Sequence, residues 1–517
     1  MEISKWQIGI TVAVIYFTSI AIYRLYLSPI AHIPGPKLAA LTRWYEGYYD
    51  VWQNGQYTFK IKELHKKYGP IIRISPVELH VNDSVFFEQL YRQDGHWDKY
   101  GWMTKAFAAD GATILTVDHA LHRARRQPLA PYFSKARITA HQDMIRKHMG
   151  KLTDRLADAS GEKKVVNLGA AVMAFTRDMS NDFVLGKCYN SLDREDFDAF
   201  IMQTAEGAGA SWRLTKHTRI WIHVLKAIPI SFLIKYGNEG MRKFFRFLLE
   251  TQQDTERLMA EAVSDTDAAN NRSIVHEIMK SKLPASEKTK DRIFEDMSTV
   301  TGAGIDTTAA ALRLILFNIY DKPEILNKLR AELSGVCSAG GEVPELKILE
   351  QLPYLTATIT EGMRLSPAIA TRMARISDGD LFYVLWRIPV GTPVGMTLVL
   401  MHTNESVYPN PLRYDPERWL DPKAKARMEK AYAPFSRGTR NCLGMQSRSP
   451  ETWFANSPTS SLAWAEMYLI IATLINRFDF KYPDATAEDF LAASDQFAIG
   501  TKGKGNLNAV VSVRDSE

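Results

Sequence analysis

Three long stretches of the chain repeat their apolar residues with the period of an α-helix, at i, i+3, i+4 and i+7. They cover residues 138–156, 240–263 and 291–320. Shorter stretches, at 71–81 and again between 374 and 399, show the alternation and β-branched content of strands. No internal repeat or long low-complexity linker interrupts the chain after its first forty residues. The pattern predicts a mainly α fold with small β-sheets, in one domain.

The N-terminal region carries a different pattern. Residues 6–23 (WQIGITVAVIYFTSIAIY) contain no charge and are flanked by Lys5 and Arg24. As a helix this run would extend roughly 27 Å, which is close to the thickness of a bilayer's hydrocarbon core. A cleaved signal peptide and a buried helix are the alternatives, but no small-residue cleavage site follows the run. The pattern favours a single-pass N-terminal transmembrane helix.

A proline-rich turn, Ile33-Pro34-Gly35-Pro36, follows the apolar run. Two prolines fix φ and stop any helix, so this turn predicts a stiff elbow. The predicted organisation is a membrane anchor over 1–28, a proline-rich hinge over 29–36, and one catalytic body over 37–517.

Composition narrows the function classes. The chain has 517 residues, 46% of them hydrophobic and 24% charged, which is a globular composition. The net charge of +6 is mildly basic, and no basic run with interleaved aromatics indicates nucleic-acid binding. The three widely spaced cysteines, Cys188, Cys337 and Cys442, argue against a disulfide framework and against a cysteine-rich zinc site. They favour a reducing compartment.

The most specific motif is residues 435–444, FSRGTRNCLG. A thiolate at Cys442 needs compensation, and backbone N–H groups of a glycine-containing loop running into a helix N-terminus can supply it. Gly438 and Gly444 would let the backbone approach a flat macrocycle closely. The alternative is a structural cysteine beside a turn. A match of five positions in ten residues to one motif argues against that alternative.

This motif resembles the F-x-x-G-x-R-x-C-x-G loop of cytochromes P450, and the chain is identified as a member of that family. The resemblance implies a single P450 fold that binds haem b, with Cys442 as the axial thiolate ligand of the iron. It also places Phe435, Gly438 and Gly444 in the haem-binding loop. Arg440 would pair with a haem propionate, as its counterpart does in the family.

A second pair of motifs follows the family's order. Glu361 and Arg364 form an E-x-x-R on a helix, where residues i and i+3 share a face. Arg418, in the sequence PERW, resembles the arginine of the family's P-E-R-F segment. The resemblance implies that these three residues form a buried ion-pair triad beneath the haem loop. Buried ions of this kind must be paired with one another, so the triad would be structural.

Residues 303–308 (AGIDTT) lie on the predicted helix 291–320 and resemble the family's oxygen-activation segment. Asp306 and Thr307 would be the catalytic pair, relaying protons to the distal oxygen. Gly304 would leave room for dioxygen and substrate. The alternative is a helix whose polar side chains bond back to its own carbonyls.

Three more basic residues are expected at the haem propionates. His122 and Arg126 stand at the spacing of the family's W-x-x-x-R, so both could donate to one carboxylate across a helical turn. The segment 367–375 follows the E-x-x-R helix and passes over the haem in the family. Arg375, or in second place Arg372, would meet a propionate there.

One stretch departs from the family's pattern. The family's cysteine loop runs directly into a long helix, whereas here residues 447–461 (SRSPETWFANSPTSS) intervene before Leu462. Five serines and two prolines make this stretch a poor helix, because proline costs about 3 kcal/mol in a helix interior. Joining Gln446 to Leu462 would restore one helix. We therefore expect an inserted loop, either a gene-model artefact such as a retained intron or a functional extra loop.

The resemblance implies a monooxygenase that inserts one oxygen atom of O₂ into an apolar small molecule. NADPH–cytochrome P450 reductase would dock on a basic face near Arg437, with cytochrome b5 as a further electron donor. The enzyme would face the cytosol from the endoplasmic reticulum membrane. Residues 122–126 (HRARR) and 131–134 (PYFS) most resemble fungal secondary-metabolism members of the trichodiene oxygenase type, which suggests a terpenoid or polyketide-derived substrate.

Three rival functions remain open at this point. A haem-thiolate isomerase or dehydratase would need no reductase, although Asp306 and Thr307 argue against it. A haem-binding protein without turnover would follow if the 447–461 insertion disables the site. A membrane-anchored helical scaffold would carry no haem.

Overall fold

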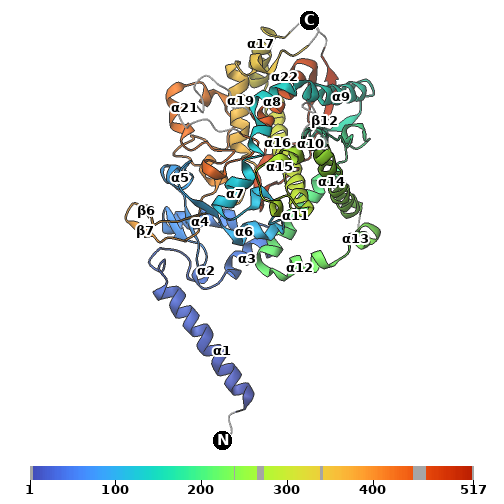
Figure 1. Ribbon diagram of the computed structural model, residues 1–517. Helices are drawn as coiled ribbons and strands as arrows, with labels where there is room; N and C mark the ends of the chain where they lie inside the picture. Colours follow the sequence, from blue (N-terminus) through green and yellow to red (C-terminus); the bar gives the residue numbers. More distant parts are fainter. Residues whose placement is uncertain (1–3, 238, 265–272, 338–341, 446–460, 515–517) are drawn as a thin grey trace.

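The computed structural model describes residues 4–237, 239–264, 273–337, 342–445 and 461–514. Helices make most of the body, and the longest, α16 (Lys290–Asp321), runs through its centre (Figure 1). The other helices are α1 (Lys5–Ile22), α2 (Lys37–Leu41), α3 (Trp44–Gly47), α4 (Tyr57–Tyr68), α5 (Ser84–Leu90), α6 (Gly101–Thr104), α7 (His119–Arg126), α8 (Lys135–Ala140), α9 (Gln142–Gly161), α10 (Leu168–Leu185), α11 (Phe200–Thr218), α12 (Ile220–Ala227), α13 (Ile230–Tyr236), α14 (Glu239–Ser264), α15 (Ile274–Lys280), α17 (Pro323–Ser334), α18 (Leu346–Leu349), α19 (Pro353–Leu365), α20 (Leu398–His402), α21 (Pro422–Glu429) and α22 (Leu462–Arg477).

The strands form small sheets at the edges of the helical body. A five-stranded sheet has the order β1-β2-β8-β5-β3, a three-stranded sheet the order β4-β12-β9, and the pairs β6-β7 and β10-β11 are hairpins. The strands are β1 (Ile71–Arg73), β2 (Leu79–Val81), β3 (Trp97–Lys99), β4 (Val165–Asn167), β5 (Arg375–Ser377), β6 (Leu381–Tyr383), β7 (Trp386–Ile388), β8 (Val394–Gly395), β9 (Phe478–Lys481), β10 (Ala492–Gln496), β11 (Ala498–Thr501) and β12 (Asn508–Val513). The expected mainly α fold with small β-sheets is confirmed.

The predicted elements are found with small differences. The patterns at 240–263 and 291–320 correspond to α14 and α16. The alternating stretch at 71–81 forms the antiparallel pair β1-β2. The pattern at 138–156 is divided at His141. The ring nitrogen Nδ1 of His141 lies 2.7 Å from the Arg137 carbonyl oxygen. That contact ends α8, and α9 starts with the next residue.

The core is organised around α10 and α16. Nearly every residue of α10 is buried, although its second half carries polar and charged side chains. Two of its polar side chains bond to the neighbouring helix: Thr176 Oγ1 donates to the Ile305 carbonyl at 2.9 Å and Ser180 Oγ to the Thr301 carbonyl at 3.2 Å. These bonds fix the part of α16 that carries the AGIDTT segment.

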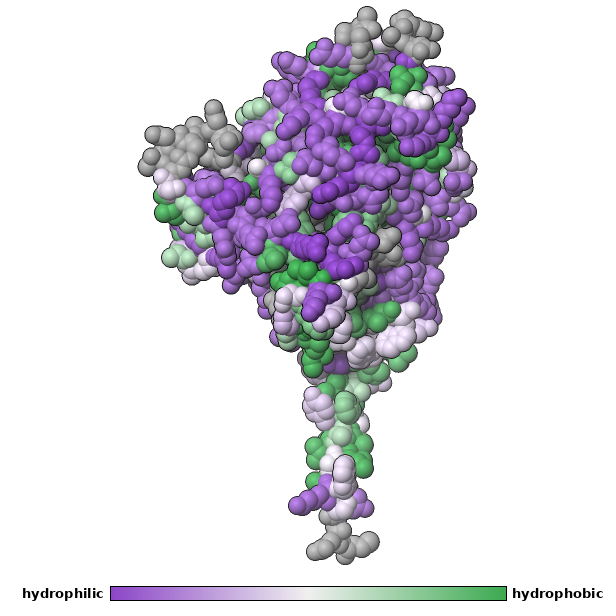
Figure 2. Space-filling view, turned by 90° about the vertical axis from the view of Figure 1, so that its right-hand side faces the viewer, coloured by the Kyte–Doolittle hydropathy of each residue, from purple (hydrophilic) through white to green (hydrophobic). Residues whose placement is uncertain are grey.

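The first helix, α1, projects away from the body (Figure 1) and carries a continuous hydrophobic surface (Figure 2). None of its side chains is buried. Among the described residues, two helical stretches are long and apolar enough to cross a bilayer: Lys5–Leu27, which is entirely unburied, and α16, which is mostly buried. Because α16 is a core helix, only the N-terminal stretch has its apolar surface free.

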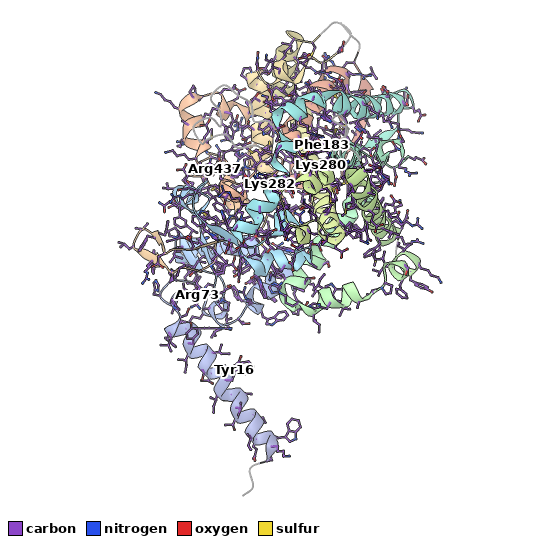
Figure 3. The ribbon with its side chains drawn as sticks, in the orientation of Figure 1. Tyr16, Arg73, Phe183, Lys280, Lys282 and Arg437 are labelled. Carbon is purple, nitrogen blue, oxygen red and sulfur yellow. The ribbon has the colours of Figure 1, made fainter. Side chains whose placement is uncertain are left out.

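The proline-rich turn is held against the five-stranded sheet by Arg73, labelled at this junction in Figure 3. The Arg73 side chain donates to the Arg24 carbonyl at 2.7 Å, and its backbone N–H donates to the Pro34 carbonyl at 2.7 Å. A Cβ at Gly35 would collide with the Arg73 carbonyl oxygen, so only glycine permits this approach. The base of the projecting helix is therefore fixed to the body.

Candidate functional site

A cavity of about 970 Å³ lies between α16 and the loop that carries Cys442. Its walls come from segments far apart in the chain: α7, α10, α16, α22 and residues 435–444. The polar and charged side chains that line it are Lys99, Thr113, His122, Arg126, Ser180, Thr299, Thr307, Thr308, Arg440, Asn441, Cys442 and Glu466. The rest of the lining is mainly apolar, so this cavity suits a large, mostly apolar group with a few charges.

Cys442 lines this cavity, and its side chain is exposed there. The Cys442 N–H donates to the Phe435 carbonyl at 3.0 Å, which closes the loop. Burial raises the pKa of the Cys442 thiol, and the backbone N–H groups of Gly444 and Met445 and the charge of Arg126 act in the opposite direction. These groups stabilise a thiolate, as expected for the loop. The supporting amides belong to the loop itself, because α22 begins only at Leu462.

The two loop glycines serve different purposes. Gly438 has a φ of +77°, and a Cβ there would lie 2.7 Å from the Tyr91 carbonyl oxygen. This glycine is therefore required for packing against the end of α5, where Thr439 N–H donates to the Arg92 carbonyl at 3.2 Å. At Gly444 a Cβ would be only in ordinary contact with the Cys442 sulfur, at 3.8 Å. The packing constraint accounts for Gly438, and the expectation that Gly438 and Gly444 let the backbone approach a macrocycle stays a prediction.

A cluster of five basic residues gathers beside the cysteine loop, and four of them line the cavity. Its members are Lys99, His122, Arg126, Arg375 and Arg440. Among the described residues, none of the five has a carboxylate in salt-bridge distance. Burial and the neighbouring cations lower the pKa of His122 to about 2, so this ring is neutral. The same two causes lower the pKa of Arg440 to about 10.

The cations of this basic cluster are held by backbone carbonyls. Arg440 donates to the carbonyls of Trp97, Thr116 and Val117 at 2.6–3.1 Å. Arg126 donates to the Asn441 carbonyl at 2.7 Å and to the Cys442 carbonyl at 3.1 Å. Both residues therefore position the loops around the cavity in addition to lining it.

Lys99 and Arg375 stand directly opposite each other on the paired strands β3 and β5. Both side chains are buried, and one guanidinium nitrogen of Arg375 has no hydrogen-bond partner among the described residues. Like charges opposite one another in a sheet are destabilising, so an anion bound nearby would stabilise this arrangement. The second candidate, Arg372, forms salt bridges with Glu78 at 2.7 Å and Glu46 at 2.9 Å, which excludes it from the basic cluster.

The segment 303–308 forms the wall opposite Cys442. Thr307 lines the cavity and donates through Oγ1 to the Ala303 carbonyl at 2.8 Å. Gly304 also lines the cavity, but a Cβ there would meet the Ser180 oxygen of α10 at 2.5 Å. The glycine is thus needed for close packing of α10 on α16, and the expectation that it also leaves room over the cavity stays a prediction.

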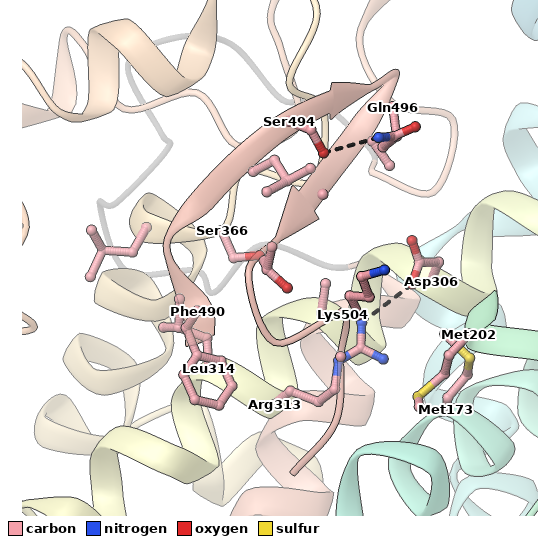
Figure 4. A pocket seen from close by; sticks show the side chains of 17 residues that line it. Met173, Met202, Asp306, Arg313, Leu314, Ser366, Phe490, Ser494, Gln496 and Lys504 are labelled. Carbon is pink, nitrogen blue, oxygen red and sulfur yellow. Dashed lines mark hydrogen bonds and ion pairs between the residues drawn. The ribbon is translucent and has the colours of Figure 1, made fainter. Parts of the chain in front are cut away.

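Asp306 is directed away from Thr307. It lines a second cavity of about 910 Å³ on the other side of α16, where the β10-β11 hairpin forms one wall (Figure 4). There a guanidinium nitrogen of Arg313, which follows Asp306 on α16, lies 3.3 Å from an Asp306 carboxylate oxygen. The structure therefore does not bring Asp306 into the Cys442 cavity, and its role beside Thr307 stays a prediction.

Glu361, Arg364 and Arg418 are brought together as the sequence predicted. Arg364 donates two bonds of 2.8 Å to the two carboxylate oxygens of Glu361, and Arg418 adds one at 3.0 Å. Trp419, on the short 3₁₀ helix Pro416–Trp419, also donates to Glu361 at 2.9 Å. Glu361 and Arg364 are fully buried. All the charges of this ion-pair triad are satisfied internally.

A family model described as Cytochrome P450 matches residues 44–505. The chain belongs to the cytochrome P450 family. Its fold agrees: a crystal structure of a cytochrome P450 (CYP102L1) has a TM-score of 0.68 at 16% identity, covering 88% of this chain and 94% of that one. Retinoic acid bound cyanobacterial CYP120A1 has a TM-score of 0.65 at 18% identity, covering 88% and 94%.

Fungal P450 monooxygenases are among the similar curated proteins. Cytochrome P450 monooxygenase tpcC of Cochliobolus heterostrophus is 38% identical over 89% of this chain and 86% of its own length. Tryptophan 6-hydroxylase fscE of Fusarium equiseti is 36% identical over 94% and 93%, and N-acetyltryptophan 6-hydroxylase ivoC of Emericella nidulans is 34% identical over 95% and 94%. The expected resemblance to fungal P450s of secondary metabolism is confirmed, and the chain is an oxidoreductase.

The P450 family and fold imply haem with a cysteine thiolate on the iron. The residues present fit that group. Of the three cysteines only Cys442 lines the cavity, and the basic cluster provides the charges that two propionates would neutralise. The unpaired nitrogen of Arg375 is an orphaned donor of the kind that a propionate would satisfy. His122, Arg126, Arg375 and Arg440 therefore remain the proposed propionate partners.

Sequence reasoning missed two residues of this P450 site. Lys99 lies in a short strand without a motif, and only its pairing with Arg375 reveals it. Glu466, on α22, lines the cavity, and burial raises the pKa of this carboxyl well above its usual value. For Glu466, the isolated charge in an apolar helix pattern was the available signal.

The predicted insertion over 447–461 lies outside the described residues except for Ser461. Its two flanks are described. Met445 and Ser461 form an antiparallel bridge, so the two flanks lie side by side. Ser461 caps α22 by accepting from the Trp464 N–H at 3.2 Å. The helix after the cysteine loop therefore begins at Leu462 and has its own N-cap, Ser461. This is expected if a stretch is inserted before Leu462.

Proposed function

We propose that this P450 is a membrane-anchored monooxygenase that inserts one oxygen atom of O₂ into an apolar product of fungal secondary metabolism. The observation that carries the proposal is one cavity bounded by Cys442 on one side and Thr307 on the other. Haem bound there would supply an iron centre that activates dioxygen. The family implies the monooxygenase reaction on a small molecule, with O₂ and a redox partner.

The side chains of this chain would position and protonate. Thr307 is near the Cys442 cavity, and its hydroxyl, now bonded to the Ala303 carbonyl, could turn to donate a proton into the cavity. Asp306 would resupply that proton from the second cavity, where it is paired with Arg313. The apolar lining would exclude bulk water from the reacting centre. An isomerase or dehydratase needs no such hydroxyl, so Thr307 favours the monooxygenase over these rival reactions.

The membrane anchor is proposed from α1. Its exposed apolar length, with Tyr16 on its surface (Figure 3), fits a lipid environment better than water. We propose the endoplasmic reticulum membrane, with the body in the cytosol. Removing residues 1–28 should release much of the protein from membranes while the haem spectrum is retained. Complete membrane retention of the folded truncated protein would contradict the proposal.

NADPH–cytochrome P450 reductase is the proposed electron donor, and cytochrome b5 a further one. The expected docking residue, Arg437, is mostly buried: it bonds the Glu429 and Tyr432 carbonyls and thereby ties α21 to the cysteine loop (Figure 3). The exposed basic residues of this face are on and beside α21, namely Lys423, Arg427 and Lys430. Reversing these three charges should raise the KM for reductase and leave the haem spectrum unchanged.

The substrate class has two candidates. The resemblance of residues 122–126 and 131–134 to fungal P450s favours a terpenoid or polyketide-derived compound. Two relatives, however, are named for the 6-hydroxylation of tryptophan and of N-acetyltryptophan. Comparing the metabolites of a fungal host with and without the gene tests both. An oxygenated terpenoid or polyketide supports the first, an oxygenated indole the second, and no NADPH-dependent product would contradict the monooxygenase proposal.

A further inference from the structure

Three groups of side chains outside the Cys442 cavity bring potential metal ligands together among the described residues. They are Glu46-Asp50-His217, His96-Asp98-Asp118 and His148-Asp178-Cys188. The first group already holds a cation, because the Lys216 ammonium lies 2.8 Å from Glu46 and also bonds Asp50. The second is solvent-accessible throughout and offers no thiol. The third combines three different ligand types and is largely buried.

In the third group, each ligand comes from a different segment. His148 is on α9, Asp178 on α10, and Cys188 on the turn that follows Gly186. Gly186 has a φ of +65° and ends α10, so the chain turns back toward Asp178. One ligand atom from each residue lies within 4.8 Å of the other two. His148 and Asp178 are fully buried, while Cys188 is partly exposed and leaves a path for an ion to enter.

The hydrogen bonds of His148 leave one ring nitrogen free. Nε2 lies 2.9 Å from an Asp182 carboxylate oxygen. An ionised carboxylate only accepts, so Nε2 carries the proton and Nδ1 carries a lone pair in the neutral ring. Nδ1 is buried and has no hydrogen-bond partner among the described residues. A carboxylate that orients an imidazole in this way is the usual second partner of a metal-binding histidine.

The other two ligands are also prepared for a cation. The Asp178 oxygens accept from the Ser191 N–H at 2.9 Å and the Leu192 N–H at 3.0 Å, which orients the carboxylate and leaves further lone pairs free. Cys188 Sγ accepts from the Asn190 N–H at 3.3 Å, which orients the sulfur. Asp178 forms no salt bridge among the described residues, and Lys151 is bonded to Asp193 at 2.8 Å. A divalent ion would neutralise Asp178 and displace the thiol proton of Cys188.

We propose that His148, Asp178 and Cys188 bind one zinc ion. Imidazole, thiolate and carboxylate are the ligand types of protein zinc sites, and water would complete a tetrahedron. A thiolate with an imidazole disfavours Mg²⁺ and Ca²⁺, which take oxygen ligands. The ion would join α9, α10 and the turn after α10. Since α10 holds the AGIDTT segment through Thr176 and Ser180, the site would stabilise the helix pair behind the Cys442 cavity.

The test uses the full-length, haem-loaded protein, in which Cys442 is engaged by iron. Equilibrium dialysis against zinc chloride, followed by metal analysis, should find one zinc ion per chain that a chelator removes. Cys188→Ser should bind zinc about a hundredfold more weakly, because the loss of a ligand exceeds the loss of an outer partner. Cys337→Ser is the matched control and should bind like the parent protein, since Cys337 is another partly exposed thiol and has no such neighbours among the described residues.

Asp182→Asn provides a second variant that keeps all three ligands. It should weaken zinc binding by about 10–100-fold, and an unchanged haem spectrum in each variant shows that the body is folded. Zinc should also raise the unfolding temperature of the parent and of Cys337→Ser, but not of Cys188→Ser. Equal zinc binding by Cys188→Ser and the parent, or no saturable binding by the parent, would overturn the proposal.

Discussion

Two buried charge clusters of this P450 differ in how their charges are satisfied. In the ion-pair triad, Glu361 receives bonds from Arg364, Arg418 and Trp419, so the cluster is complete within the protein. In the basic cluster, Lys99 and Arg375 face each other with no carboxylate in reach among the described residues. The first arrangement is what a structural centre needs. The second is complete only with a bound anion, which a haem with two carboxylates would provide.

The comparison separates two meanings of a buried charge. An internally paired charge is required whenever the protein is folded, so its removal should affect stability first. An unpaired charge destabilises the folded protein until its ligand binds, so its removal should affect ligand retention first. The variants below test this distinction.

The largest effect is expected for Glu361→Gln. This change leaves Arg364 and Arg418 without their carboxylate, and breaking a buried pair costs about 3–5 kcal/mol. Urea unfolding should report that loss, together with a reduced yield of haem-containing protein. The control is Glu417→Gln. Glu417 precedes Arg418 and is an exposed partner of Lys328, so its loss should cost at most about 1 kcal/mol. Equal stability of the two variants would mean that the triad is not structural.

A smaller and opposite effect is expected for Lys99→Met. The haem should dissociate about tenfold faster, which corresponds to about 1.4 kcal/mol, because a basic side chain that lines the cavity beside Arg375 is lost. The haem-free protein should be as stable as its parent or more stable, since an unpaired buried cation has been removed. Haem transfer to apomyoglobin measures the rate, and Lys105→Met, at an exposed lysine nearby, is the control. A destabilised haem-free protein with unchanged haem retention would contradict the comparison.

Deleting residues 447–461 tests whether this inserted stretch disturbs the cysteine loop. The flanks, Met445 and Ser461, already lie side by side, and the deletion should join Gln446 to Leu462 and extend α22 back to the cysteine loop. Helix N–H groups would then reach Cys442, so haem occupancy and turnover should rise. Spectral titration and product formation measure both. Unchanged values would make the segment a tolerated loop, and a loss of activity would make it functional.

The smallest structural effect is expected for Thr307→Ala. The hydroxyl bonds only to the carbonyl of its own helix, so its loss should leave folding and haem binding nearly unchanged. Product per NADPH should fall while peroxide rises, because proton delivery into the cavity is impaired. Thr307→Ser keeps the hydroxyl and should restore coupling. An unchanged ratio of product to NADPH in Thr307→Ala would leave the residue with no catalytic role.

The sequence predicted those features that one segment carries by itself. The cysteine loop, the E-x-x-R pair and the long helix 291–320 were all visible as local patterns. Features that depend on contacts between distant segments were not. Lys99 gains its meaning only opposite Arg375, and Gly304 only against Ser180. Asp306 and Thr307 are neighbours in sequence, yet successive residues on a helix point in different directions, so they line different cavities.

The most direct test of a thiolate-ligated haem at Cys442 is the spectrum of the reduced, carbon monoxide-bound protein. The parent should show the red-shifted Soret band of thiolate ligation, and so should a variant that combines Cys188→Ser with Cys337→Ser. Cys442→Ala should lose that band, because neither remaining cysteine faces the cavity. Retention of the band in Cys442→Ala would contradict the account.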